Sequence, residues 1–324
     1  MISVVIVTRN RSDSIASISL PSLLRQDMAD FEVFVWDASD DDSTERVVLR
    51  FKRSFEQKGI PLFYRRGARQ YLASTRNDSV HETHGDVIFF LDDDAEISSD
   101  GLSAVKRYFG DFAWLKGMGL SLHDVHPRID KYVAHPFLGA FRDLIFRFFM
   151  GKPPRYRKIM NSTRNVFPVP DSPGIAEWLS GACMAYRKSV FDDLSFDEGI
   201  ERFGGYAFGE DYDFSHRVWL YYGEPLLISA CGCVVHHNAQ TARVPKGPDK
   251  VAAIYYNTAR IRDNFKAYRP YKLSPFLWEL RAGLTLPLLM QGIRPLDLIR
   301  GYLRSMRARR EYRECPKDKS VGRR

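Results

Sequence analysis

Three carboxylates stand in a row at Asp92-Asp93-Asp94, directly after the apolar run Val87–Leu91. Adjacent like charges repel, and each carboxylate costs free energy if it is taken out of water unpaired. A calcium loop of the EF-hand type is excluded, because Ile97 stands where that loop needs glycine. Taken alone, the triplet is also compatible with a solvated turn after a strand.

Polar clusters also follow two earlier apolar runs. They are Thr8-Arg9-Asn10-Arg11 after Ile2–Val7, and Asp37-Ala38-Ser39-Asp40 after Phe31–Trp36. In a doubly wound sheet, ligands bind beyond the carboxyl ends of the strands, near the point where the strand order reverses. We therefore expect both clusters and the acidic triplet at one ligand-binding edge. The turn "TRNRSDS" contains no glycine, so a GxGxxG dinucleotide loop is absent, and no GxxxxGK[ST] motif occurs.

The elements that would position these clusters alternate between β-rich runs and helical patterns. We expect strands over Ile2–Val7, Phe31–Trp36, Leu62–Tyr64 and Val87–Leu91, and helices from Ser12 or Asp13 to about Leu24, from Asp42 or Ser43 to beyond Phe55, and over Arg69–His81. This succession predicts right-handed crossovers and an α/β, doubly wound, mostly parallel sheet.

The segment that begins at Trp178 is dense in groups that could do chemistry. We expect strands over Ala182–Tyr186, Leu226–Ile228 and Cys231–Val235, and helices over Glu210–Tyr222, Val251–Tyr268, Pro275–Met290 and Pro295–Tyr312. The shift to helical patterns predicts one domain over residues 1–245 and a helical, basic C-terminal extension over residues 246–324.

The 324 residues carry a net charge of +8, which suggests an anionic partner. From Arg294 onward, eleven basic and four acidic residues leave +7, so the rest of the chain is nearly balanced. The chain lacks the interleaved aromatic and basic residues of a nucleic-acid surface, so we disfavour a nucleic-acid-binding protein.

Several features bear on where the protein works. The four cysteines form no CxxC pair, and "MISVVIVTRNR" lacks the features of a signal peptide. No run reaches the roughly 18 uncharged apolar residues that a membrane-spanning helix needs. We expect a reducing, cytoplasmic setting.

Together these features resemble the family 2 glycosyltransferases of the GT-A fold. The resemblance spans about Met1 to Asn238 and depends on the order and spacing of motifs that are not specific alone. They are Thr8-x-Asn10-Arg11, Asp37-x-Ser39-Asp40, Arg76-Asn77, "GDVIFFLDDD", Gly181, "FDE" at Phe196–Glu198, "GEDYDFSHR" at Gly209–Arg217, "YYGE" and the strand into His236. For the whole chain, the resemblance implies an α/β, Rossmann-like, doubly wound mixed sheet with a C-terminal helical extension. It also implies inverting transfer of a sugar from a nucleotide diphosphate to a hydroxyl. A divalent cation would offset the charge that builds on the departing oxygens.

The resemblance implies that Asp94 ligates the metal, with Asp92 nearer the ribose or the metal shell. Oxygen ligands suit Mg2+ or Mn2+, and an imidazole ligand from His236 would favour Mn2+. Where a strand alternates, only one of His236 and His237 can face the metal, and the family pattern selects His236. Asp93 is grouped with the donor-nucleotide residues, although we expect its side chain to face away.

For the nucleotide, the resemblance implies that Asp37 accepts a hydrogen bond from a pyrimidine N3–H. The alternative for Asp37 is a helix N-cap or an Asx turn. The same pocket would be lined by Thr8, Arg9 and Asn10. Arg76 would lie near the donor, or would be an exposed helix residue paired with Asp78 or Glu82.

For the chemistry, the resemblance implies that Asp211 is the general base that takes the proton of the acceptor hydroxyl, with Glu210 as its hydrogen-bonding neighbour. The alternative is that both acids simply favour the first turn of a helix. Trp178 and Gly181 would shape the sugar or acceptor subsite, and the alternative for Trp178 is a core position.

Two features suggest membrane contact. The segment 137–149 has an apolar helical face, which would pack on the protein or lie in a lipid interface. The basic C-terminal helices would be attracted to anionic lipids. Our hypothesis is an enzyme peripheral to the inner face of the plasma membrane that glycosylates a lipid-linked saccharide in cell-envelope or exopolysaccharide synthesis. UDP-sugars and dTDP-rhamnose both fit a pyrimidine pocket.

Two other classes of protein are alternatives. A nucleotidyltransferase shares the sheet and the acidic metal site, but would carry a glycine-rich loop after the first strand. A catalytically inactive GT-A scaffold protein is disfavoured because Asp94, Asp211 and His236 are all present.

Overall fold

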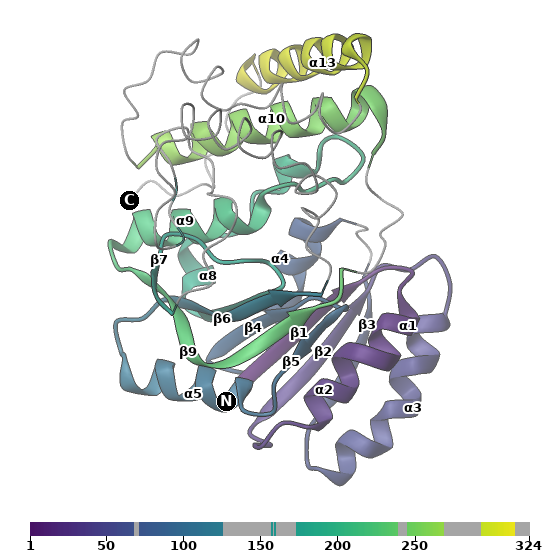
Figure 1. Ribbon diagram of the computed structural model, residues 1–324, viewed down its shortest axis with the longest axis vertical. Coiled ribbons are helices and arrows are strands. Elements are labelled where there is room, and N and C mark those ends of the chain that lie inside the picture. The colour runs from purple at the N-terminus through teal and green to yellow at the C-terminus, as the bar shows by residue number, and fades with distance from the viewer. Residues whose placement is uncertain are drawn as a thin grey trace, which may run out of the picture.

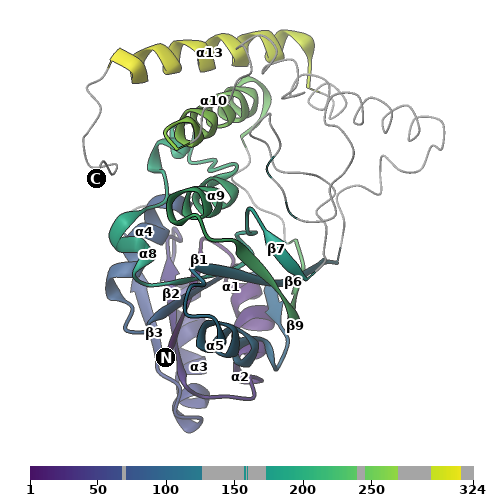
Figure 2. The ribbon, with the colours of Figure 1, turned by 90° about the vertical axis from the view of Figure 1, so that its left-hand side faces the viewer.

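The structure, a computed structural model, describes residues 1–67, 71–125, 157, 159, 173–238, 245–268 and 293–314. Its centre is a nine-stranded mixed sheet with helices on both faces (Figures 1 and 2). The strands are β1 (Ile2–Thr8), β2 (Phe31–Asp37), β3 (Leu62–Arg66), β4 (Val87–Leu91), β5 (Ala95–Ile97), β6 (Gly117–Asp124), β7 (Gly174–Ala176), β8 (Cys183–Arg187) and β9 (Leu226–His236).

The expected doubly wound α/β architecture is confirmed, but the sheet is parallel only in part. Its order is β3-β2-β1-β4-β8-β6-β9-β5, with β7 paired to β9. The first four strands pair in parallel, as do β6 and β9, whereas β8 runs antiparallel to both β4 and β6. The sheet is therefore mixed, as expected for the whole chain, and the mostly parallel pairing predicted from the first hundred residues holds as far as β4. The strand–helix succession on which that prediction depended ends there.

The helices divide between the two faces of the sheet. They are α1 (Ser12–Ser14), the π-helical η1 (Ile15–Ser19), α2 (Leu20–Leu24), α3 (Ser43–Gln57), α4 (Leu72–Glu82), α5 (Gly101–Asp111), α8 (Val190–Asp193), the 3-10 helix η2 (Glu198–Glu201), α9 (Glu210–Tyr222), α10 (Gly247–Lys266) and α13 (Pro295–Glu314). Because successive strand residues point to opposite faces, Val4 packs with Phe55 of α3 in one core, while Val5 packs with Phe214 of α9 in another.

Most predicted elements form within a few residues of their expected bounds, and β4 and α9 match them. The elements that were not predicted are β5, α5, β6, β7, α8 and η2. The two short strands expected near residue 230 are one strand, β9, because Gly232 adopts a φ of 72° and carries the strand through an irregular register. A Cβ on Gly232 would lie 2.9 Å from the Cα of Gly101, so this close approach requires glycine.

The C-terminal helices form a stack on α9, with α10 between α9 and α13 (Figure 2). The side-chain amide of Asn257 in α10 donates to the carbonyls of Tyr206 and Phe208, so α10 holds the loop that leads into α9. Helices predicted over segments 137–149 and 275–290 lie outside the described residues. Within the part of the chain that is described, no helix combines the length and apolar character needed to cross a membrane.

An aromatic cluster joins α9 to the sheet and allows a test of its packing. The ring of Phe214 lies 4.1 Å from that of Phe196 and 5.0 Å from that of Tyr186, measured between centroids. We expect Phe214→Ala to lower the free energy of unfolding by about 3–5 kcal/mol, because it leaves a buried cavity. Leu49→Ala, at an exposed position of α3, is the control and should change it by less than about 0.5 kcal/mol. Equal effects in urea denaturation would contradict this core assignment.

Candidate active site

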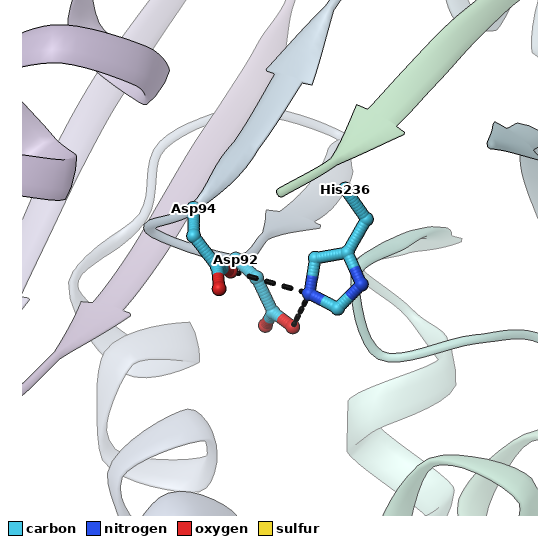
Figure 3. Close-up of side chains that lie close together, drawn as sticks. All are labelled: Asp92, Asp94 and His236. Carbon is cyan, nitrogen blue, oxygen red and sulfur yellow. Dashed lines mark ion pairs between the residues drawn. The ribbon is translucent and has the colours of Figure 1, made fainter. Parts of the chain in front are cut away.

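The acidic triplet and His236 meet where β4 and β9 end. Strand β9 lies between β5 and β6, and His236 pairs in register with Ala95 on one side and Asp124 on the other. One ligand atom each from Asp92, Asp94 and His236 lies within 4.8 Å of the others. Figure 3 shows the imidazole pointing toward the two carboxylates. Its Nε2 lies 3.2 Å from Asp94 Oδ1 and 3.9 Å from Asp92 Oδ2.

A carboxylate behind His236 fixes the direction of its ring. Asp124 Oδ1 lies 3.0 Å from His236 Nδ1, so Nε2 is the nitrogen presented to Asp92 and Asp94. The structure brings His236, not His237, to the triplet. His237 lies instead with its Nε2 3.2 Å from Glu96 Oε2, as expected for alternating strand positions.

The surroundings of His236 are strongly anionic. Burial lowers the pKa of His236, but its hydrogen bonds to Asp94 and Asp124 and the charges of Asp92 and Asp94 outweigh burial and raise it to about 9. The same charges that hold a proton would hold a cation.

This donor set fits the expected metal. Two carboxylates and one imidazole, with a carboxylate behind the imidazole, form a common arrangement for binding a divalent ion. Asp92, Asp94 and His236 would hold Mn2+ or Mg2+, and the imidazole ligand would favour Mn2+. The acids are half-buried and buried respectively, so a bound ion would be partly shielded from solvent.

Arg11 supports the triplet, a role that the sequence analysis did not assign. Its two terminal nitrogens lie 2.8 Å from Asp93 Oδ1 and 2.5 Å from Asp94 Oδ2. Thr8 Oγ1 donates to Asp93 Oδ2 at 2.7 Å, so the end of β1 is tied to the end of β4. Burial raises the pKa of Asp93 to about 7, although Arg11 and Thr8 oppose the shift.

The Asp37 carboxylate lies fully buried at the end of β2, in the next polar cluster. Its Oδ1 accepts from the Ser39 backbone N–H at 2.8 Å, the Asx turn that was the alternative interpretation. Its Oδ2 accepts from Tyr64 Oη at 2.9 Å and from Arg66 at 3.1 Å. One oxygen of Asp37 thus stabilises the turn. The other accepts from the Tyr64 phenol and the Arg66 guanidinium, to which the sequence analysis assigned no role.

The loop after β1 lies against the loop after β2. The Asn10 side chain donates to Asp40 Oδ2 at 2.6 Å and accepts from the Asp40 backbone N–H at 2.8 Å. The Asn10 backbone N–H donates to Ser39 Oγ at 2.7 Å, and Arg9 pairs with Asp40 at 2.8 Å. Asn10 adopts a φ of 53°, a conformation that asparagine tolerates better than most residues. Thr8, Arg9, Asn10 and Asp37 are therefore neighbours, as expected for one pocket.

Arg76 lies at the junction between the triplet and α9. It is buried on α4, and it pairs with Glu210 and, at 3.4 Å, with Asp92 Oδ1. It also donates to the Gly181 carbonyl at 3.2 Å. The alternative of an exposed residue paired with Asp78 or Glu82 was wrong, because α4 turns this position toward the sheet.

The two acids of α9 differ in exposure. Glu210 is buried, and burial together with the neighbouring Asp211 charge raises its pKa to about 8 despite the partner Arg76. Asp211 is half-buried, with Oδ2 3.0 Å from the Gly181 backbone N–H and Oδ1 2.8 Å from the Tyr212 N–H. Burial raises the pKa of Asp211 as well, although these two N–H groups and Arg76 oppose the shift.

Gly181 and Trp178 occupy different surroundings. A Cβ on Gly181 would lie 3.1 Å from the Arg76 guanidinium and 3.4 Å from Asp211 Cβ, so glycine leaves room for both side chains. Trp178 is buried in a cluster with Ile200, Tyr212 and Phe265. Gly181 thus lies in the site, and Trp178 packs behind it.

The first comparison is with protein families. Residues 3–112 match the model of the family described as glycosyl transferase family 2. A curated protein, the GalNAc(5)-diNAcBac-PP-undecaprenol beta-1,3-glucosyltransferase of Campylobacter jejuni, is 29% identical over 106 residues. These matches support a family 2 glycosyltransferase. The aligned part covers 33% of this chain and 33% of the C. jejuni protein, and the family match ends before α9 and His236.

Solved structures extend the comparison to most of the chain. S. aureus TarS 1-349 superposes with a TM-score of 0.55 at 16% identity, covering 88% of this chain and 70% of that one. The mannosyltransferase PcManGT from Pyrobaculum calidifontis, solved with GDP-Man and Mn2+, superposes with a TM-score of 0.52 at 16% identity. The match covers 96% of this chain and 81% of PcManGT. At these identities the likeness shows the fold alone, and the chain has the GT-A fold.

The carboxylate behind His236 gives a prediction for the metal site. Asp124→Ala should raise the Kd for Mn2+ about 10- to 100-fold, because the imidazole loses the partner that orients it. Binding of Mn2+ alone, followed by electron paramagnetic resonance, measures this without any turnover. His237→Ala is the matched control and should leave the Kd unchanged, since its ring lies beside Glu96. The metal assignment is overturned if Asp124→Ala binds as tightly as the unaltered protein.

Proposed function

We propose that the protein is an inverting, metal-dependent glycosyltransferase that moves a sugar from a nucleotide diphosphate donor to a hydroxyl of a saccharide. One observation carries this proposal: Arg76 and Gly181 join the Asp92–Asp94–His236 group to Asp211 within a single site. A cation site and a candidate base are the two parts that such a reaction needs. The family match supports the same class of enzyme.

The donor would lie along the ends of β1, β2 and β4. Asp37 would bind the base, with its Oδ2 exchanging the hydrogen bond from Tyr64 or Arg66 for one from a pyrimidine N3–H. Thr8, Arg9 and Asn10 would line the same pocket. UDP-sugars and dTDP-rhamnose both satisfy this chemistry.

The diphosphate would lie at Asp92, Asp94 and His236. A divalent cation held there would offset the charge that builds on the leaving oxygens. Arg11 keeps Asp93 and Asp94 in place, and Arg76 does the same for Asp92. These two guanidiniums hold the triplet together although its three carboxylates repel one another.

Asp211 would take the proton of the attacking acceptor hydroxyl. The Gly181 and Tyr212 N–H groups fix both of its oxygens, and each oxygen keeps a lone pair for the incoming proton. Its raised pKa makes it a stronger base than an ordinary aspartate. Buried Glu210 would support the site through Arg76.

For the acceptor we propose a lipid-linked saccharide of the bacterial cell envelope or of an exopolysaccharide. The C. jejuni relative is named for an undecaprenyl-diphosphate-linked acceptor. Such an acceptor would place the protein at the cytoplasmic face of the membrane.

A nucleotide-sugar panel tests the donor class. With Mn2+ present, the donor that binds should raise the melting temperature, because a ligand at 100 times its Kd stabilises the folded state by about 2.7 kcal/mol. Asp37→Ala should abolish the rise, and Asp111→Asn, at an exposed position on α5, should not. No rise with any nucleotide diphosphate sugar would overturn the proposal. A rise with nucleoside triphosphates alone would favour the nucleotidyltransferase alternative.

Asp211→Asn tests the general base. We expect kcat to fall about 100- to 10,000-fold while the Kd of the donor stays the same. In the unaltered enzyme, kcat/KM should rise with pH as Asp211 ionises, with its midpoint above the ordinary value of 3.8 because the pKa of this carboxyl is raised. In the Asp211→Asn variant this rise of kcat/KM with pH should be absent. Donor binding without hydrolysis or transfer in the unaltered protein would instead favour the inactive-scaffold alternative.

A further inference from the structure

The outer face of α13 exposes three large aliphatic side chains. Leu296, Ile299 and Leu303 are 55%, 55% and 60% exposed. Their spacing of three and four residues places them on one stripe of the helix. A single exposed leucine needs no explanation, but an adjacent group of this kind marks an interaction surface.

The same face is basic. Arg300, Arg304, Arg307 and Arg310 are exposed on it, and Glu311 is the one exposed acid there among the residues described. Arg307 lies 3.4 Å from Glu311, and Arg304 pairs with Asp249 of α10. The face therefore keeps a net positive charge beside its aliphatic stripe.

The opposite face of α13 is fixed against α10. Asp297, Gly301, Ser305 and Ala308 are buried there at a spacing of three to four residues. A Cβ on Gly301 would lie 2.4 Å from Val251 Cβ and 2.6 Å from the Pro248 carbonyl oxygen, so the two helices are in close contact. Because only this face can approach α10 so closely, α13 cannot rotate about its own axis to bury its aliphatic stripe.

The exposed face is at one end of the molecule. Figures 1 and 2 both show α13 outermost, with α10 between it and the rest of the protein. The same α10 holds, through Asn257, the loop that leads into Glu210. A surface that seats α13 would therefore hold the catalytic helix α9 at a set height, two helix layers of about 8–10 Å each away.

We propose that the outer face of α13 seats the protein on an anionic lipid surface. Leu296, Ile299 and Leu303 would enter the boundary between headgroups and acyl chains, and the arginines beside them would bind lipid phosphates. This proposal rests on the proposed function in one respect: membrane binding would bring the enzyme to a lipid-linked acceptor. The combination of an aliphatic stripe with net positive charge favours anionic lipid over a protein partner.

Vesicle flotation with the full chain, without donor or acceptor, tests the proposal. The unaltered protein should float with vesicles that contain phosphatidylglycerol and not with pure phosphatidylcholine. Removing the stripe by Leu296→Ser, Ile299→Ser and Leu303→Ser together should weaken binding at least 10-fold. Leu49→Ser, at a 58% exposed position on α3 at the far end of the molecule, is the matched control and should not change it.

Charge is tested separately. Arg300→Gln, Arg307→Gln and Arg310→Gln together should weaken binding to anionic vesicles about 100-fold. Arg46→Gln, Arg50→Gln and Arg53→Gln on α3 remove the same charge from another face and should have less than a tenth of that effect. Thermal unfolding of each variant confirms that it is folded.

Equal binding by the stripe variant and the unaltered protein would overturn the proposal, and so would equal binding to both kinds of vesicle. Loss of a dimer in the stripe variant, with vesicle binding unchanged, would identify the face as a contact between copies instead. Donor binding and hydrolysis are measured without vesicles. Their failure would overturn the proposed function while leaving the vesicle result intact.

Discussion

A buried guanidinium is the constraint on which the arrangement of the site depends. The Arg76 guanidinium lies beside the rings of Phe90 and Phe196, 5.6 Å from the centroid of each, where an unpaired charge would be strongly unfavourable. Its partners are Glu210, Asp92 and the Gly181 carbonyl, which come from three other parts of the chain. One cation thus fixes the start of α9 and the loop before β8 relative to the end of β4.

The same constraint explains the difference between the two acids of α9. Glu210 is buried and forms an ion pair with Arg76, so it holds α9 in place. Asp211 is the next residue of α9. Its carboxylate accepts a hydrogen bond from the Gly181 N–H and stays partly exposed. A helix that begins with two acids therefore supplies one for structure and, in the proposed function, one for chemistry. The absence of a side chain at position 181 leaves room for Arg76 at the Gly181 carbonyl and for Asp211 at the Gly181 N–H.

The C-terminal helices are connected to this core by a buried ionic network. Arg260 of α10 pairs with Asp197 at 2.5 Å, and Asn264 donates to both Asp197 and Asp213. Asp213 also pairs with Arg217 at 2.8 Å within α9. The segment beyond residue 245, which we expected to form an extension, therefore shares buried polar contacts with the helix that carries Asp211.

Local patterns in the sequence were enough to predict the strands and helices from β1 to β4 and the helix α9. Continuous apolar runs gave β1, β2 and β4, a helical period gave α9, and polar clusters after the strands indicated the ligand-binding edge. These signals are local, because strand burial and helix amphipathicity repeat every two to four residues. Strand β5 has only three residues and gives little local signal. Helix α5 was missed although its buried Leu102, Val105 and Phe109 follow a helical spacing.

Only the tertiary structure decided which side chains meet. Arg76 and Glu210 are 134 positions apart, and His236 and Asp124 are 112 apart, so no local pattern relates them. The order of strands beyond β4 placed Asp124 behind His236, and the end of β1 placed Arg11 on the triplet. Sequence motifs predicted which residues are chemically capable, and long-range pairing of strands and buried charges determined their partners, because such pairs are selected by burial and geometry rather than by neighbours in the chain.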